Sequence, residues 1–156
     1  LDRSSAASDV YKRQGYRGQD ENHWQNMIDS PSRRAWSGYS FEQLCLHHIR
    51  QIKRKLGISG VQSDVCAWKG DGSQIDLLID RRDQTIDLCE MKFSQGEFEI
   101  TKQYDAHLRE RAESFRSATK TRKALHQTFV TTYGVKKNMY SGNVQSEVEL
   151  DDLFAE

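Results

Sequence analysis

The sequence contains little proline, has no net charge and lacks any long apolar stretch. Of its 156 residues one is proline, and 23 basic side chains balance 23 acidic ones. This neutrality argues against a protein that coats nucleic acid by bulk charge, although it leaves room for a local basic face. No run is apolar enough for a membrane helix and no signal-peptide pattern opens the chain, so we expect a cytoplasmic protein without a membrane partner.

Cysteine is also scarce, and its three copies lie far apart. Cys45, Cys66 and Cys89 each stand in an apolar context. Close Cys/His pairs of the kind that hold zinc are missing, which argues against a zinc site at these residues. We therefore predict three buried free thiols in a reducing compartment.

The first residues do not look like part of a fold. Residues 1–20 are polar and show no periodicity, and residues 1–14 resemble translated adapter read-through at the edge of a metagenomic fragment. We exclude residues 1–20 as a disordered or artefactual tail, treat 21–36 as a linker, and assign 37–156 to one domain. On this interpretation the natural protein extends further upstream.

The clearest helical pattern spans residues 40–56. An apolar stripe follows helical spacing from Phe41 to Leu56, Ser40 with Gln43 forms a capping box, and Gly57 suits the C-terminal end. Thr101 predicts the cap of a second helix, over 102–118. Strands are predicted at 61–68, 74–80, 85–93, 127–133 and 147–150. The order α-β-β-β-α-β predicts an α/β fold with a mixed sheet flanked by helices.

The two central strands form a predicted hairpin that carries unexpected charge. Asp76 lies in the first strand, and Glu90 and Lys92 lie in the second. Glu90 and Lys92 share a face because strand side chains alternate. Such groups are costly to bury unless they are paired or bind something. Two carboxylates beside a lysine suit a hard cation such as Mg²⁺ together with a phosphate.

A helix with a glutamate, followed by strands that bear Asp and Glu-x-Lys, resembles the PD-(D/E)XK nuclease superfamily. More specifically, three phrases resemble the nuclease-like C-terminal domain of bacterial and archaeal AAA-type ATP-binding proteins. They are Gly38-Tyr39-Ser40-Phe41-Glu42, Gln74-Ile75-Asp76-Leu77-Leu78-Ile79 and Cys89-Glu90-Met91-Lys92-Phe93-Ser94. The resemblance covers roughly residues 20–156 and implies a restriction-endonuclease-like core.

The resemblance implies a role for each polar residue. Asp76 matches the metal-binding aspartate of the superfamily, and Glu90 matches its second acidic ligand. Lys92 matches the lysine that orients the attacking water or stabilises charge at the phosphate. Glu42 matches the glutamate of the first helix that helps hold a metal in some branches. Ile75 departs from the name-giving pattern, which has proline there. The implied activity is Mg²⁺-dependent DNA cleavage. An ATPase domain would lie upstream, outside this chain, because no Gly-x-x-x-x-Gly-Lys-Ser/Thr motif occurs here.

Other interpretations stay open at this point. The cluster of Asp76, Glu90 and Lys92 also fits a buried ion-pair network without chemistry, and the domain also fits a catalytically inactive DNA- or partner-binding module of an ATPase. Glu42 fits a first-turn carboxylate favoured by the helix dipole. The basic residues of 102–123 fit either a DNA-facing surface or a solvated helix face.

Overall fold

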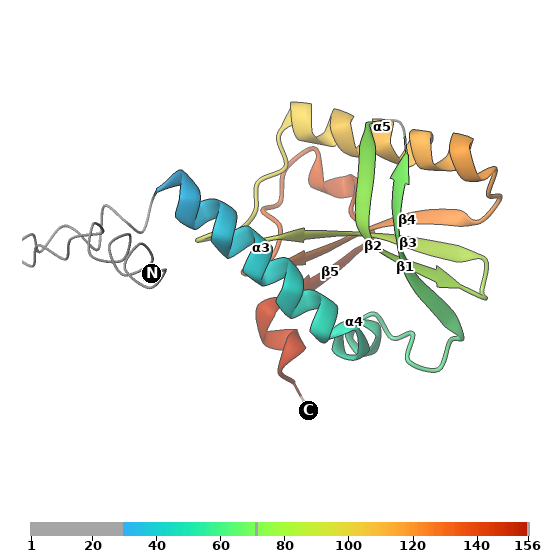
Figure 1. Ribbon diagram of the computed structural model, residues 1–156, viewed down its shortest axis with the longest axis horizontal. Helices are drawn as coiled ribbons and strands as arrows, with labels where there is room; N and C mark the ends of the chain where they lie inside the picture. The colour runs from blue at the N-terminus through green and yellow to red at the C-terminus, as the bar shows by residue number, and fades with distance from the viewer. Residues whose placement is uncertain (1–29, 71, 156) are drawn as a thin grey trace, which may run out of the picture. The chain divides into compact units, whose positions relative to one another are not determined.

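The computed structural model describes residues 30–70 and 72–155 (Figure 1). The chain divides into two compact units, Leu1–Trp36 and Ser37–Glu156. The predicted tail, 1–20, and residues 21–29 of the predicted linker lie outside the described residues. No helix among residues 30–70 and 72–155 is long and apolar enough to cross a membrane.

Five strands form one mixed sheet in the order β1-β2-β3-β4-β5. The first three are joined antiparallel, whereas β3–β4 and β4–β5 pair parallel. The parallel β3–β4 pair is connected through helix α5, as a crossover requires. The mixed α/β architecture and its element order confirm the prediction. The strands are β1 (Ser63–Gly70), β2 (Ser73–Arg81), β3 (Thr85–Lys92), β4 (Ala124–Thr131) and β5 (Ser146–Glu149).

The first helix differs from the prediction. It begins at Pro31 as α3 (Pro31–His47), is interrupted at His48, and resumes as α4 (Ile49–Lys55). Proline suits a first helical position, and the Ser30 hydroxyl accepts a hydrogen bond from the Arg33 amide at 3.3 Å. Ser40 therefore lies inside α3, and the predicted capping box with Gln43 is wrong. Beyond α4, Gly57 adopts φ +70°, as predicted for a residue that ends a helix.

Helix α5 (Lys102–Thr119) matches its prediction closely. The Thr101 side chain accepts a hydrogen bond from the Tyr104 amide at 3.2 Å and caps the helix, and Lys120 ends it in the left-handed region. Leu108 and Phe115 are buried beneath it. Two short 3₁₀ helices, η1 (Ser141–Asn143) and η2 (Leu150–Leu153), complete the described elements.

Helices cover both faces of the sheet (Figure 1). On one face, Phe41 and Cys45 of α3 and Ile52 of α4 pack with side chains of β2 to β5, among them Leu77 and Met91. On the other face, α5 packs against a separate apolar set. That set comprises Ile75, Leu78, Ile86 and Leu88, with Ile100, Phe129 and Val135 alongside, and α5 contributes Leu108 and Phe115. The sheet is thus the middle layer, and its two faces have different chemical surroundings.

The cysteines divide into two kinds. Cys45 and Cys89 are buried, as predicted; burial raises the pKa of the Cys45 thiol to about 12 and that of Cys89 well above its ordinary value. Cys66 is exposed, so its predicted burial is wrong. The reason is its place on β1, an edge strand whose central residues are exposed.

Candidate functional site

The sheet opens at the predicted site. Pairing between β2 and β3 ends at Leu77 and Cys89, and Asp76 and Glu90 are the next residues beyond that pair. Beyond this point β2 stays paired to β1, while β3 stays paired to β4 as far as Lys92. We call this opening between β2 and β3 the fork (Figure 1). The two predicted carboxylates therefore stand at its two sides.

A β-bulge lies in β2 at the fork. The pairing with β1 shifts between Cys66 and Trp68, so Asp76 and Leu77 together stand opposite Ala67. A bulge breaks the strict alternation of a strand and re-aims a side chain. It places Asp76 in solvent while the adjacent Leu77 stays in the core.

Glu90 is a buried carboxylate with several donors. It is 7% exposed, and its Oε1 accepts from the Tyr104 hydroxyl at 2.6 Å and lies 2.9 Å from Lys92 Nζ. Its Oε2 forms an ion pair with Arg111. Burial by itself raises the pKa of Glu90, but Lys92, Arg111 and the Tyr104 hydrogen bond outweigh it and hold the pKa below its usual value. Glu90 is thus ionised and fixed in place.

Arg111 and Tyr104 connect α5 to the fork. Besides Glu90, the Arg111 guanidinium donates to the Gln74 carbonyl at 3.4 Å, and so bridges β3 and β2. The Lys92 ammonium lies 5.7 Å from the centre of the Tyr104 ring. The Lys92 side chain remains 35% exposed. Lys92 is therefore the cation of the cluster that an incoming anion can reach.

Glu42 and Asp76 complete the acidic side of the fork. Asp76 accepts a hydrogen bond from the Gln74 side chain. The pKa of Glu42 is raised, first by burial, then by the negative charge of Asp76; Glu90 adds to the rise and Lys92 opposes it. The negative charges of Asp76 and Glu90 thus both act on Glu42. Glu42 lies well inside α3, which rules out the interpretation as a first-turn carboxylate.

The donor set suits Mg²⁺ in kind. Carboxylate oxygens are the protein ligands that Mg²⁺ prefers, and it needs only one or two of them because it retains several waters. Within residues 30–70 and 72–155, however, no three His, Cys, Asp or Glu side chains stand where they could share one ion. The ligand set to consider is therefore two carboxylates, Asp76 and Glu90, together with water. In this structure both Glu90 oxygens already accept from protein donors.

Sequence reasoning missed two members of this site. Helical spacing predicts Tyr104 on the inward, apolar side of α5, and Arg111 is one of the basic residues of 102–123, yet both contact Glu90. Their separation of seven residues, two helical turns, puts them on the same side of a helix. The seven-residue spacing could have shown that Tyr104 and Arg111 lie on one side of α5. It does not show which strand that side of the helix faces.

Three of the six other basic residues of 102–123 bind within the protein. Arg109 pairs with Asp105 and Lys123 with Asp80. Arg116 donates to backbone carbonyls at the end of α5. These three residues support the fold, whereas Lys102, Lys120 and Arg122 are exposed, so for those three the DNA-facing surface and the solvated face both stay predictions.

Comparison with known proteins adds little. No family model matches the chain, and no curated protein matches it. Among solved structures the chain is similar to a protein of unknown function, AF1548, with 15% sequence identity and a TM-score of 0.47. The match covers 72% of this chain and 64% of that chain. A likeness this distant carries no argument about activity, so any function has to be argued from the residues at the fork.

Proposed function

We propose that this domain is a nuclease that binds DNA at the fork and hydrolyses a phosphodiester bond with Mg²⁺. The supporting observation is the gathering of Glu42, Asp76 and Glu90, from α3, β2 and β3, where the paired strands separate. A bound cation would relieve the repulsion that Asp76 and Glu90 exert on Glu42. Lys92 stands beside Glu90 with a partly exposed side chain that a phosphate could reach.

Each residue has a part in this proposal. Asp76 and Glu90 would hold the ion, with Glu42 in support. A Mg²⁺ ion held there would supply the positive charge that activates a water and offsets charge on the departing oxygen. Lys92 stabilises negative charge on the phosphate. Tyr104 and Arg111 are positioning residues, because they fix the Glu90 carboxylate. An ATPase domain upstream of this chain, as the resemblance implies, belongs to the same proposal.

A second candidate function is DNA or partner binding without cleavage, as a regulatory module. The observation that favours it is the pairing of Glu90, whose two oxygens are already held by Lys92, Tyr104 and Arg111. A metal ion has to compete with these donors for the carboxylate. In that case the cluster anchors α5 to the sheet, and DNA contact depends on exposed cations.

Plasmid nicking in Mg²⁺ or Mn²⁺ tests the cleavage proposal. We expect Lys92→Ala to lower the rate about 10²–10³-fold, the typical effect of removing a preorganised charge. Asp76→Asn should also lower it, because a metal ligand is lost. Lys55→Ala is the matched control, since Lys55 is an exposed lysine paired with Asp152 at 2.8 Å.

The outcomes separate the two candidates. Equal nicking by the parent and Lys92→Ala would show that the activity does not come from the fork. No nicking by any protein, together with salt-dependent retention of DNA on a filter, would favour the binding module. Absence of both nicking and retention would remove both candidates.

A further inference from the structure

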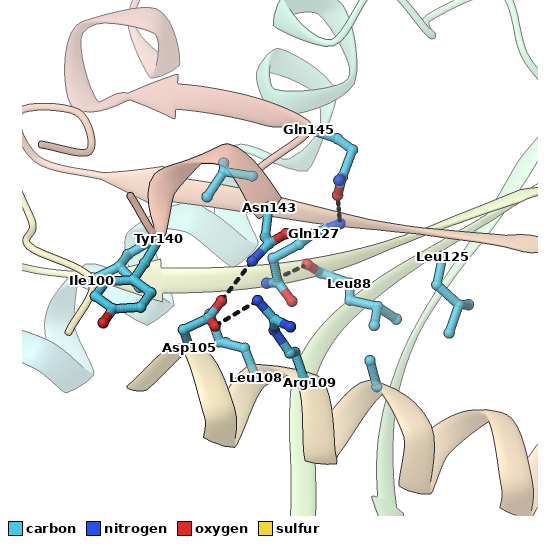
Figure 2. Close-up of a pocket in the computed structure, with 12 residues that line it drawn as sticks. Leu88, Ile100, Asp105, Leu108, Arg109, Leu125, Gln127, Tyr140, Asn143 and Gln145 are labelled. Carbon is cyan, nitrogen blue, oxygen red and sulfur yellow. Dashed lines mark hydrogen bonds and ion pairs between the residues drawn. The ribbon is translucent and has the colours of Figure 1, made fainter. Parts of the chain in front are cut away.

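A separate pocket lies beneath α5, next to the fork (Figure 2). Its volume is about 290 Å³, and its apolar lining includes Leu88, Leu108 and Leu125. Leu88 and Glu90 are two residues apart on β3, and both face α5. Two residues of a strand span about 7 Å, so the pocket and the Glu90 carboxylate at the fork are neighbours on the face of the sheet that α5 covers.

One end of the pocket is a polar cluster built around a buried carboxylate. Asp105 is 6% exposed and accepts from the Asn143 amide at 2.8 Å and from Arg109 at 2.9 Å (Figure 2). The negative charge of Asp105 is therefore balanced within the protein. A ligand at this end meets an almost neutral surface and not an anion or cation site.

Two glutamines supply the remaining polar groups. The Gln127 side-chain amide donates to the Leu88 carbonyl at 3.1 Å, and the Gln127 backbone amide donates to Gln145 Oε1 at 2.6 Å. Within the described part of the chain, Gln127 Oε1, Gln145 Nε2 and Asn143 Oδ1 have no hydrogen-bond partner. The pocket thus offers two acceptors and an amide donor from carboxamides alone.

We infer that this pocket binds one nucleobase. Its volume of about 290 Å³ lies just below the roughly 300–1,000 Å³ of small-molecule pockets, which suits a single heterocycle and not a longer ligand. Carboxamides match the adjacent donors and acceptors on the edge of a base. The leucines and the Tyr140 ring, which also lines the pocket, supply the apolar and aromatic surfaces on which bases stack.

The position of the pocket gives this site a use. Enzymes that read an unpaired base hold it by stacking and by hydrogen bonds to its edge. With a phosphate at Lys92, a base from the same strand reaches the pocket at Leu88, which lies four residues, or about 13 Å, along β3. The domain would then act on DNA that exposes an unpaired base, and this part of the inference rests on the proposed function.

Nucleoside binding in metal-free buffer tests the pocket without any cleavage. The probes are adenosine, guanosine, cytidine and thymidine, with ribose as the control that lacks a base, and binding to the full chain is followed by saturation-transfer NMR. We expect at least one nucleoside to bind and ribose not to bind. Gln145→Met and Tyr140→Leu should weaken that binding roughly 5- to 150-fold, the range for one base contact. Lys55→Ala should leave it unchanged.

The result distinguishes this inference from the proposed function. No nucleoside binding above that of ribose would overturn the base pocket, as would unchanged affinity in both Gln145→Met and Tyr140→Leu. Gln145 is exposed, so its replacement keeps the test informative even if Tyr140→Leu does not fold. A chain that binds nucleosides but never nicks DNA would retain the pocket and lose only the nuclease proposal.

Discussion

The ion pair between Glu90 and Arg111 offers the sharpest test of how the fork is built. Both side chains are largely buried, with 8% and 11% exposure. Arg111→Met keeps most of the side-chain volume and removes the charge. Breaking a buried pair from one side costs about 3–5 kcal/mol, because the remaining charge is left without its partner. Glu90 retains Lys92 and Tyr104, so we expect the lower end, about 3 kcal/mol.

Urea unfolding of the parent, Arg111→Met, Glu90→Gln and the double variant measures this directly. The double variant should lose less free energy of unfolding than the two single variants lose in sum. Each single variant leaves one charged or polar partner buried without its counterpart, whereas the double variant removes both. In Arg111→Met, Mg²⁺ should also raise the melting temperature more than it does in the parent, because the Glu90 oxygen freed from Arg111 becomes available to the ion. If Arg111→Met lowers the free energy of unfolding by less than about 0.5 kcal/mol, the range of ordinary surface changes, the Glu90–Arg111 pair does not hold the fork together.

Two further predictions concern ionisation. The pKa of Glu90 is lower in the folded chain than its ordinary value of 4.5, so its stabilising contribution is complete above pH 4.5 and is lost as the pH falls through the folded value. Urea unfolding between pH 6 and 3 should show this decline, and a slope no different in Glu90→Gln would contradict it. Cys66 should react with a thiol reagent in the native state, whereas Cys45 and Cys89 should react only after unfolding. Labelling of all three thiols at one rate without denaturant would count against the described burial.

The order of elements could be predicted from the chain because it depends on local patterns. The apolar runs around Leu77 and Leu88 define adjacent strands, and Thr101 marks the start of α5, since a hydroxyl caps a helix within three residues. The predicted start of the first helix was wrong. The apolar stripe used for the prediction begins at Phe41, whereas the helix begins at Pro31, ten residues earlier. Alternation also failed to predict the exposure of Cys66, because a strand at the edge of a sheet lacks cover that only topology reveals.

The sequence by itself determined the fold class and the presence of two acids and a lysine on neighbouring strands. Those features follow from side-chain periodicity, which acts over a few residues. Only the tertiary structure decided that β2 and β3 separate at Asp76 and Glu90, and that Arg111 and Tyr104 reach across from α5 to hold Glu90. The physical reason is that strand separation and helix rotation are set by packing between distant segments, and a linear pattern does not contain the distances over which charges pair.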